Sequence, residues 1–210
     1  MISHQNQSPV KPSRVMLIGA RGFIGSAVQR RLEEEAISTL ALGSADIDLL
    51  DTSASIHIAE ALHPNDAVVM LAAFTPDKGR DIATLMKNLT MMQSVCAAIE
   101  KSGCAHLIYI SSDAVYDSRM NRTTEETPAS PPDLYGAMHH TREIMARSLG
   151  HVPVLVLRPT VVYGLYDTHN SYGPNRFRRV AENDRRITLF GGGEETRDHI
   201  HVEDIAALTV

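Results

Sequence analysis

The sequence feature that most constrains the fold is an apolar run followed at once by three glycines spaced three residues apart, between Arg14 and Gly25. An apolar stripe at helical spacing comes next, so the pattern predicts a buried strand, a tight turn and a helix. In such a turn Gly19 permits the bend, Gly22 lets backbone approach a pyrophosphate, and Gly25 lets the helix pack close to the strand. The strand, the turn and the helix N-terminus together predict an anion site of the kind that binds dinucleotides.

Apolar strands and amphipathic segments alternate along the rest of the chain. Further strands are expected over 38–42, 67–71, 105–110 and 152–157, and helices over 24–35, 53–62, 80–101 and 133–149. This rhythm predicts a parallel sheet with right-handed crossovers. The expected fold class is therefore α/β, a Rossmann-type doubly wound parallel sheet whose ligands lie beyond the carboxyl ends of the strands.

The alternation loosens after residue 164. The elements expected there are a helix over 175–183, a short strand over 187–190, a turn over 191–193 and a final helix from residue 203. Because that helix stops without a capping residue, we expect the sequence to be part of a longer chain. The predicted parts are a disordered arm over 1–13, a dinucleotide-binding Rossmann domain over 14–164 and a small, truncated C-terminal substrate lobe over 165–210.

Composition and charge limit the classes of function. With 210 residues, the chain is long enough for one large domain, and its 43% hydrophobic and 21% charged residues are ordinary for a globular protein. The net charge of -5 argues against a nucleic-acid surface. Apolar runs fall short of the roughly 18 residues that a membrane helix needs, and the polar N-terminal segment has no signal core. We expect a cytoplasmic protein that binds neither nucleic acid nor a membrane.

The cysteines and histidines do not predict a metal site. Cys96 and Cys104 are the only cysteines and lie in apolar surroundings, which favours two buried thiols over a disulfide. The histidines, including His199 and His201, lack a ligand spacing shared with carboxylates. No metal is expected.

Two hydroxyl side chains lie where acid–base chemistry would require them. Ser112 follows the strand over 105–110 and so faces the ligand crevice, while Tyr135 begins the helix over 133–149. Such a pair can hold a substrate alcohol, with the serine as hydrogen-bond partner and the tyrosine as base. Because a free tyrosine has a pKa of about 10, a tyrosine base at neutral pH needs a nearby cation. Position 139 lies one helical turn after Tyr135 on the same face.

Taken together, these segments resemble the extended short-chain dehydrogenase/reductases, specifically the NAD-dependent epimerase/dehydratase group that acts on nucleotide sugars. The resemblance runs from Arg14 to the last residue. Its motifs occur in the family's order, at Gly19–Gly25, Leu71–Ala73, Ser111–Tyr116, Glu126–Pro128, Tyr135–Gly136, Arg158–Gly164 and Arg197–Asp204. Chains of the family usually continue well past this point, which implies that part of the substrate lobe is missing here.

The resemblance implies roles for matching residues. It identifies Ser112 and Tyr135 as the catalytic pair, with His139 at the third catalytic position. The residues that it implies for binding NAD(P) are Gly19, Arg21, Gly22, Phe23, Ile24, Gly25, Asp51, Leu71, Ala72, Ala73, Asn88, Tyr135 and His139. Those implied for the nucleotide-sugar substrate are Thr75, Asp113, Arg176 and Arg197. Of these, Asp51 would approach the adenine amino group, and Arg197 would grip the diphosphate of the sugar nucleotide.

The departure from the family pattern is at position 139, where His139 replaces a lysine. That lysine normally holds the nicotinamide ribose hydroxyls and lowers the tyrosine pKa. His139 either substitutes with weaker or pH-dependent activity, or supports a different proton path, or belongs to a site that only binds. Two functions follow: an NAD(P)-dependent nucleotide-sugar epimerase, dehydratase or reductase, and a non-catalytic NAD(P)-binding sensor or interaction protein of the same fold.

Cofactor choice depends on the end of the second strand. An acidic residue there favours a free ribose 2′-hydroxyl, whereas an arginine nearby accommodates a 2′-phosphate. The strand is followed by Gly43 and Ser44 without an acid, and Arg21 is placed to meet a phosphate, which favours NADP. Asp46 leaves NAD open. By analogy with the family, we also expect a homodimer formed through the two long helices.

Overall fold

The central sheet is built from short apolar runs. The computed structural model describes residues 10–117, 119–120, 122–167, 173–189, 192 and 196–210. The strands of the sheet are β1 (Arg14–Ile18), β2 (Ser38–Leu42), β3 (Asp66–Met70), β4 (His106–Ile110) and β5 (Val154–Leu157). They pair in parallel in the order β2-β1-β3-β4-β5, so the direction of winding reverses beside β1. This confirms the predicted Rossmann-type α/β fold.

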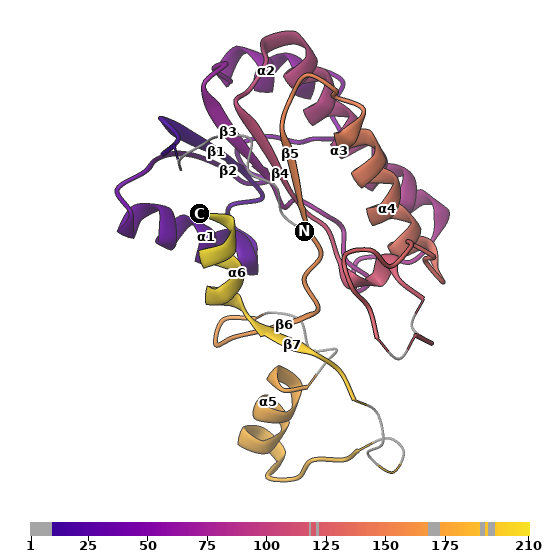
Figure 1. The fold of residues 1–210 in the computed structure, drawn as a ribbon. Helices are drawn as coiled ribbons and strands as arrows, with labels where there is room; N and C mark the ends of the chain where they lie inside the picture. Colours follow the sequence, from indigo (N-terminus) through magenta and orange to yellow (C-terminus); the bar gives the residue numbers. More distant parts are fainter. Residues whose placement is uncertain (1–9, 118, 121, 168–172, 190–191, 193–195) are drawn as a thin grey trace.

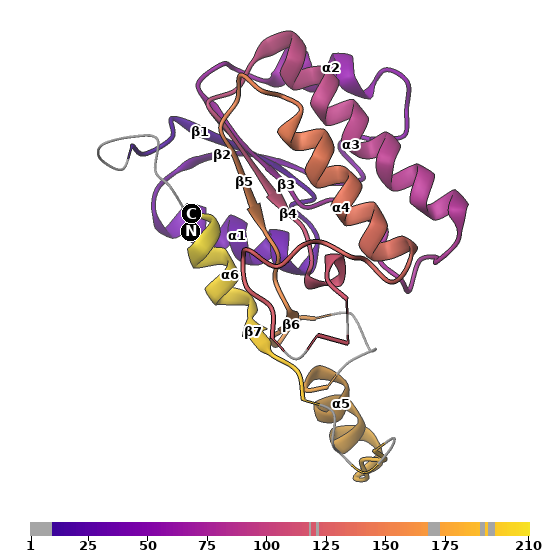
Figure 2. The same cartoon turned by 45° about the vertical axis from the view of Figure 1, so that its right-hand side comes forward.

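Helices cover both faces of this sheet. On one face lie α2 (Ala54–Ala61), α3 (Ile82–Ser102) and α4 (Leu134–Arg147), and on the other lie α1 (Phe23–Glu34) and α6 (Val202–Thr209) (Figures 1 and 2). Because successive side chains of a strand point to opposite faces, Met16 and Ile18 of β1 join one core and Val15 and Leu17 join the other. A strand buried on both faces must be apolar throughout, which is what the sequence pattern detected.

Aspartates fix where the two long helices begin. The Asp81 side chain accepts a hydrogen bond from the Thr84 backbone N–H at 2.8 Å and caps α3. Asp133 accepts one from the Gly136 N–H at 2.9 Å and caps α4. A carboxylate in this position satisfies an otherwise unpaired N–H and interacts favourably with the helix dipole.

Beyond β5 helices form where they are expected, over 175–183 and from residue 203, but the short strands differ from the expected plan. Three-residue strands β6 (Val161–Tyr163) and β7 (His199–His201) pair in parallel, and α5 (Asn175–Asp184) lies beyond them, away from the main sheet (Figure 1). After β7 the chain returns, because α6 packs against α1 and an ion pair joins Arg30 to Glu203 at 2.6 Å. Part of the segment over 165–210, namely α6, therefore packs on the sheet domain.

Three further expectations concern segments that lie partly outside the described residues, namely the strand over 187–190, the turn over 191–193 and the arm over 1–13. Residues 187–189 form no strand, and residue 190 of that expected strand lies outside the described residues. So do residues 191 and 193 of the expected turn and residues 1–9 of the expected arm. Across the described part of the chain, the helices are too short or too polar to cross a membrane.

The glycine turn between β1 and α1 depends on very close backbone approaches. Gly19 has a φ of +96°, a region that favours glycine, and its N–H donates to the Leu42 carbonyl at 2.8 Å. A Cβ added to Gly25 would lie 2.2 Å from the Gly19 carbonyl oxygen. The first turn of α1 therefore sits directly against the end of β1.

Replacing Gly25 with alanine should destabilise the protein. The added methyl collides with backbone that cannot move aside without disturbing the turn, so we expect Gly25→Ala to lower the free energy of unfolding by about 2 kcal/mol. Urea denaturation measures this. Gly150→Ala is the matched control, because a Cβ at Gly150 meets no atom within 4 Å, and it should be neutral or slightly stabilising. Equal losses in the two variants would contradict this account of the turn.

Candidate functional site

A cavity of about 110 Å³ opens at the carboxyl ends of β1, β2 and β3. This is where the winding reverses, the usual ligand position in such sheets. Its wall is mostly apolar and includes Gly19, Gly43, Asp48, Leu50, Ala72 and Met91. An apolar slot with a few polar groups at its edge suits a flat heteroaromatic ring.

The glycine turn and the end of β3 come together at this cavity. A Cβ on Gly19 would lie only 2.7 Å from the Ala72 backbone nitrogen, so the first glycine and the segment Leu71–Ala73 are in direct contact. Helix α1 begins beside them with Gly22 as its N-cap, which provides no side-chain hydrogen bond. The amides of the first turn, including those of Phe23 and Ile24, are thus left to backbone or ligand partners.

Arg21 and Asp46 meet at the end of β2. Their side chains form an ion pair at 3.0 Å, and Asp46 also accepts a hydrogen bond from the Gly43 N–H at 2.8 Å. A Cβ at Gly43 would lie 2.9 Å from Arg21 Cδ, so the arginine lies across that glycine. The cation that favours NADP and the carboxylate that leaves NAD open therefore occupy the same corner of the crevice.

Two other residues expected to bind the cofactor have partners of their own. The Asp51 carboxylate accepts hydrogen bonds from the N–H and hydroxyl of Ser53, both at 2.7 Å, and these hydrogen bonds lower its pKa. Asp48, not Asp51, forms part of the cavity wall. Buried Asn88 holds both the N–H and the carbonyl of Phe74, at 2.8 and 3.0 Å, and so shapes the loop after β3.

Ser112 and Tyr135 lie on two segments that pack together. Ser112 caps the short 3₁₀ helix η1 (Asp113–Val115), and its hydroxyl accepts from the Ala114 N–H at 3.1 Å. A Cβ at Gly136 would lie 2.0 Å from the Ala114 carbonyl oxygen, so the first turn of α4 rests on η1. Only glycine permits this contact, which brings the turn carrying Ser112 against the helix turn carrying Tyr135.

His139 lies inside the protein beneath Tyr135. It is 3% exposed, its Nδ1 is 2.7 Å from the Tyr109 hydroxyl, and its ring is edge-on to Tyr135 with centroids 4.7 Å apart. Its Nε2 has no hydrogen-bond partner within the described residues. Burial, and then the charge of Arg142, lower the pKa of His139 to about 3. A ring with this pKa is neutral near pH 7.

Arg142 is a buried residue that the sequence reasoning did not identify. It is fully buried, and its Nη2 donates to the Ala72 carbonyl at 2.9 Å. Its guanidinium carbon lies 5.3 Å from the centroid of the Tyr109 ring. Arg142 follows His139 by three positions and so shares its helix face, a spacing that offered a signal. A buried cation thus lies under the crevice although the family's lysine is absent.

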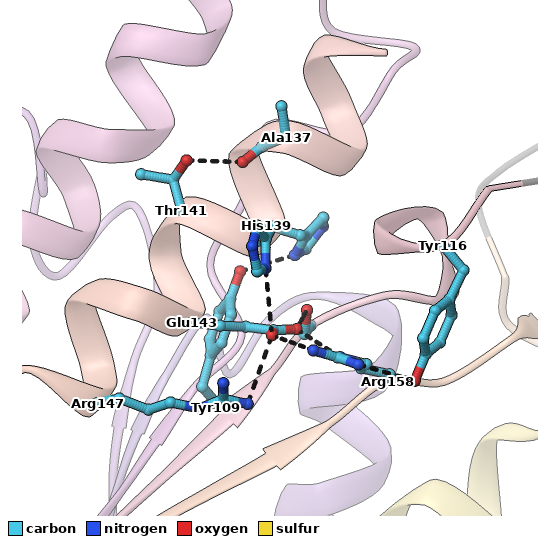
Figure 3. Close-up of polar contacts among 10 residues, drawn as sticks. Tyr109, Tyr116, Ala137, His139, Thr141, Glu143, Arg147 and Arg158 are labelled. Atoms are coloured by element: carbon cyan, nitrogen blue, oxygen red, sulfur yellow. Dashed lines mark hydrogen bonds and ion pairs between the residues drawn. The ribbon is translucent and has the colours of Figure 1, made fainter. Parts of the chain in front are cut away.

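Glu143 connects α4 to the ends of β4 and β5. Its buried carboxylate accepts from the Ser111 hydroxyl at 2.6 Å and from Arg158 at 2.8 and 2.5 Å. Arg158 in turn donates to the Tyr116 hydroxyl at 2.8 Å. Figure 3 shows Glu143 between Arg147 and Arg158, with Tyr109 and His139 beside it. Burial acts to raise the pKa of Glu143, but the hydrogen bonds from Arg158 and Ser111 outweigh it and the pKa is lowered.

The residues expected to contact substrate do not form one cluster. Thr75 follows β3 and donates to Asp77, and Asp113 lies beside Ser112 in η1. Arg176 belongs to α5 and lines a different cavity, of about 410 Å³. Arg197 is exposed ahead of β7. Two of the four therefore lie at the sheet edge, and the other two belong to the segment beyond it.

The cysteines match the expectation of buried thiols. Cys96 and Cys104 are both free and buried, and burial raises the pKa of each thiol to about 11. Thiols of that kind are poor nucleophiles. In the described part of the chain, His, Cys, Asp and Glu side chains form no cluster of three or more that could hold a metal ion.

Comparison with known proteins places this geometry in a family. The model of the NAD dependent epimerase/dehydratase family matches residues 15–210. N-acetyl-alpha-D-glucosaminyl-diphospho-ditrans,octacis-undecaprenol 4-epimerase of Escherichia coli O157:H7 is 28% identical over 207 residues, which covers 91% of this chain and 60% of that protein. Methionine adenosyltransferase 2 subunit beta of Mus musculus is 31% identical over 161 residues, covering 72% of this chain and 47% of that protein. The chain thus spans roughly half of these relatives.

Solved structures share the fold. One is UDP-glucuronic acid 4-epimerase from Bacillus cereus in complex with UDP-glucuronic acid and NAD, with a TM-score of 0.77 and 22% identity. The match covers 93% of this chain and 71% of that one.

Removing the charge of Glu143 should cost stability. Glu143→Gln leaves Arg158 without its carboxylate in a buried setting, so we expect a loss of about 3 kcal/mol in the free energy of unfolding at pH 7. Because the folded-state pKa of Glu143 is lowered, its contribution is fully present above about pH 4.3 and is lost as pH falls through the lowered value. The deficit of the variant should therefore shrink in acid.

Urea denaturation at several pH values measures this deficit. Glu182→Gln is the matched control, because Glu182 forms only an exposed ion pair with Arg178 at 3.1 Å and should lose about 0.3 kcal/mol. A Glu143→Gln variant as stable as the control would refute the structural importance of the buried pair.

Proposed function

The chain belongs to the NAD dependent epimerase/dehydratase family, and we propose that it binds NAD(P) in the crevice above β1, β2 and β3 and acts on a nucleotide sugar. The observation that carries this proposal is the contact between Gly136 and Ala114, which brings Tyr135 to the turn that contains Ser112. The substrate class is supported by the UDP-glucuronic acid 4-epimerase, which was crystallised with UDP-glucuronic acid and NAD. The name of the Escherichia coli relative gives a sugar joined to undecaprenol through a diphosphate, so it shares the diphospho-sugar part of such a substrate but not the nucleotide.

The residues of the crevice fit a dinucleotide. The apolar slot bordered by Leu50 and Met91 suits the adenine ring, and the start of α1 suits the pyrophosphate. Near α4, the Nε2 atom of His139 is a buried polar atom without a protein partner among the described residues, as expected of a group that meets a ligand. We infer that the nicotinamide end lies there.

In the proposed reaction, Tyr135 and Ser112 have different roles. A bound NAD(P) supplies hydride transfer to and from a ring carbon of the sugar. Tyr135 removes the proton of the hydroxyl on that carbon, or returns it in the reverse direction, and Ser112 orients the hydroxyl by a hydrogen bond. The keto sugar is then epimerised, dehydrated or released, or else a keto sugar is reduced by the reverse route. The protein is an isomerase in the first case, a lyase if it eliminates water, and an oxidoreductase if it releases or reduces the keto sugar.

The second candidate function is that of a protein that binds NAD(P) but does not catalyse a reaction. The relatives include the beta subunit of methionine adenosyltransferase 2, a protein named as a subunit of another enzyme. Together with the replacement of the family's lysine by His139, this favours a non-catalytic NAD(P)-binding sensor or interaction protein as the alternative. The two functions share the crevice and differ only in turnover.

We also propose a cytoplasmic homodimer formed through α3 and α4. Four large apolar side chains of these helices are exposed, namely Ile82, Met86, Leu134 and Ile144. Such a surface fits a four-helix contact between two copies. Sedimentation equilibrium measures the mass in solution, and a monomeric mass would contradict the homodimer.

Tyr135→Phe should separate binding from chemistry. Removing the phenolic hydroxyl should lower turnover by about 100-fold or more, while the dissociation constant for NADH stays within about twofold. Nicotinamide fluorescence measures binding, and a panel of UDP-, GDP- and dTDP-sugars reports turnover. Tyr166→Phe, at a side chain that is 72% exposed, is the control and should change neither. NADH binding by the unmodified protein without turnover of any sugar would favour the sensor.

Arg21→Ala tests the expected preference for NADP. Loss of a charge-assisted hydrogen bond to the 2′-phosphate should raise the dissociation constant for NADPH about tenfold. The constant for NADH should change by less than about twofold, because NADH has no 2′-phosphate. Arg119→Ala, which removes an exposed cation paired with Asp117, is the control. An equal rise in the dissociation constants for NADPH and NADH would show that Arg21 does not contact the 2′-phosphate.

A further inference from the structure

Arg142 is a buried cation without a counter-ion. It is fully buried, and it makes no ion pair with a carboxylate among the residues that the structure describes. The adjacent Glu143 points its oxygens at Ser111 and Arg158 instead. Burying a charge in this way is costly, and hydrogen bonds must compensate for the lost water. The groups that Arg142 contacts must therefore stabilise its charge.

The contacts of Arg142 lead to Tyr109. The guanidinium donates to the Ala72 carbonyl and lies over the Tyr109 ring. Burial raises the pKa of Tyr109 to about 12, and the charge of Arg142 only partly offsets this, so the phenol keeps its proton. The Tyr109 hydroxyl is buried, so its hydrogen needs an acceptor inside the protein.

That acceptor is His139. The Tyr109 oxygen and His139 Nδ1 are 2.7 Å apart, a distance at which either atom could donate. If Nδ1 donated, the buried phenolic hydrogen would have no acceptor among the described residues, so the assignment that satisfies it directs this hydrogen at Nδ1. A neutral imidazole carries one hydrogen, and when Nδ1 accepts, the hydrogen is on Nε2. Nε2 lies on the side of the ring away from Nδ1, buried and without a partner among the described residues. The chain of hydrogen bonds therefore ends in an unpaired Nε2–H donor beside Tyr135.

We propose that Tyr109 and Arg142 are positioning residues that, with His139, take the place of the lysine in the family pattern. Tyr109 fixes His139 in the tautomer that presents Nε2–H to a hydroxyl of the bound dinucleotide. Arg142 supplies the permanent positive charge beneath it. One lysine side chain, which donates and carries charge at once, is thus divided between a neutral donor and a separate cation. Only the identity of the ligand rests on the proposed function.

The tautomer of His139 tests the proposal without any ligand. Long-range ¹H–¹⁵N NMR spectra of the ¹⁵N-histidine-labelled protein at pH 7 distinguish a protonated from an unprotonated ring nitrogen, and His139→Gln assigns the signal. We expect an Nε2–H tautomer that becomes a mixture in Tyr109→Phe and is unchanged in the control Tyr166→Phe. A charged ring or an Nδ1–H tautomer in the unmodified protein overturns the proposal, even if Tyr109→Phe fails to fold.

Exchange of the charge between two positions tests the role of Arg142. His139→Lys alone places a second cation beside Arg142, so the dissociation constant for NADH should rise about tenfold. Combining His139→Lys with Arg142→Met restores the family's arrangement and should return that constant to within about threefold of the unmodified protein. Equal or tighter binding by His139→Lys alone overturns the proposal. If the unmodified protein binds no dinucleotide, the proposed function fails, while the NMR result still decides the tautomer.

Discussion

Three contacts between backbone segments, each closer than a side chain would allow, position the whole site. Gly25 lies against the Gly19 carbonyl, Gly19 lies against Ala72, and Gly136 lies against Ala114. The first two bring α1 and the end of β3 to one corner of the sheet, and the third seats α4 on the turn after β4. The two halves of the site are thus held by rigid elements at fixed separations. Side chains such as Tyr135 need only modest adjustment to meet a ligand.

The sheet and its helices followed from the sequence because the strands β1, β3 and β4 are largely buried and are rich in apolar residues, with amphipathic segments between them. The pairing of β6 with β7 could not be predicted, since three-residue strands have no usable period and their partners are far apart in the chain. The return of α6 to α1 was missed for the same reason: it depends on a long-range contact. In both places tertiary structure determines the elements and local propensity has little influence.

Some residues of the site could be identified from the sequence and others could not. Glycines at special positions carry a strong signal, and Gly19, Gly22 and Gly25 formed the expected turn. Tyr109 was concealed, because a tyrosine in an apolar strand reads as core. Arg142 was concealed because an arginine on an amphipathic helix is usually solvated, and only its position on the buried face reveals otherwise. The involvement of Glu143 and Arg158 required the folded geometry, in which segments from three parts of the chain converge.

The packing of α6 on α1 bears on the order in which the molecule is completed. Val28 and Leu32 of α1 share a core with Val202 and Ala206 of α6, so one face of the sheet contains residues from both ends of the described chain. A ribosome delivers α1 long before residues 202–209. Throughout that interval the apolar side chains that α6 will cover remain accessible to solvent and to other proteins, whereas the core of the opposite face is complete once β5 has emerged. During synthesis one face of the nascent domain therefore exposes apolar surface, to which a chaperone can bind.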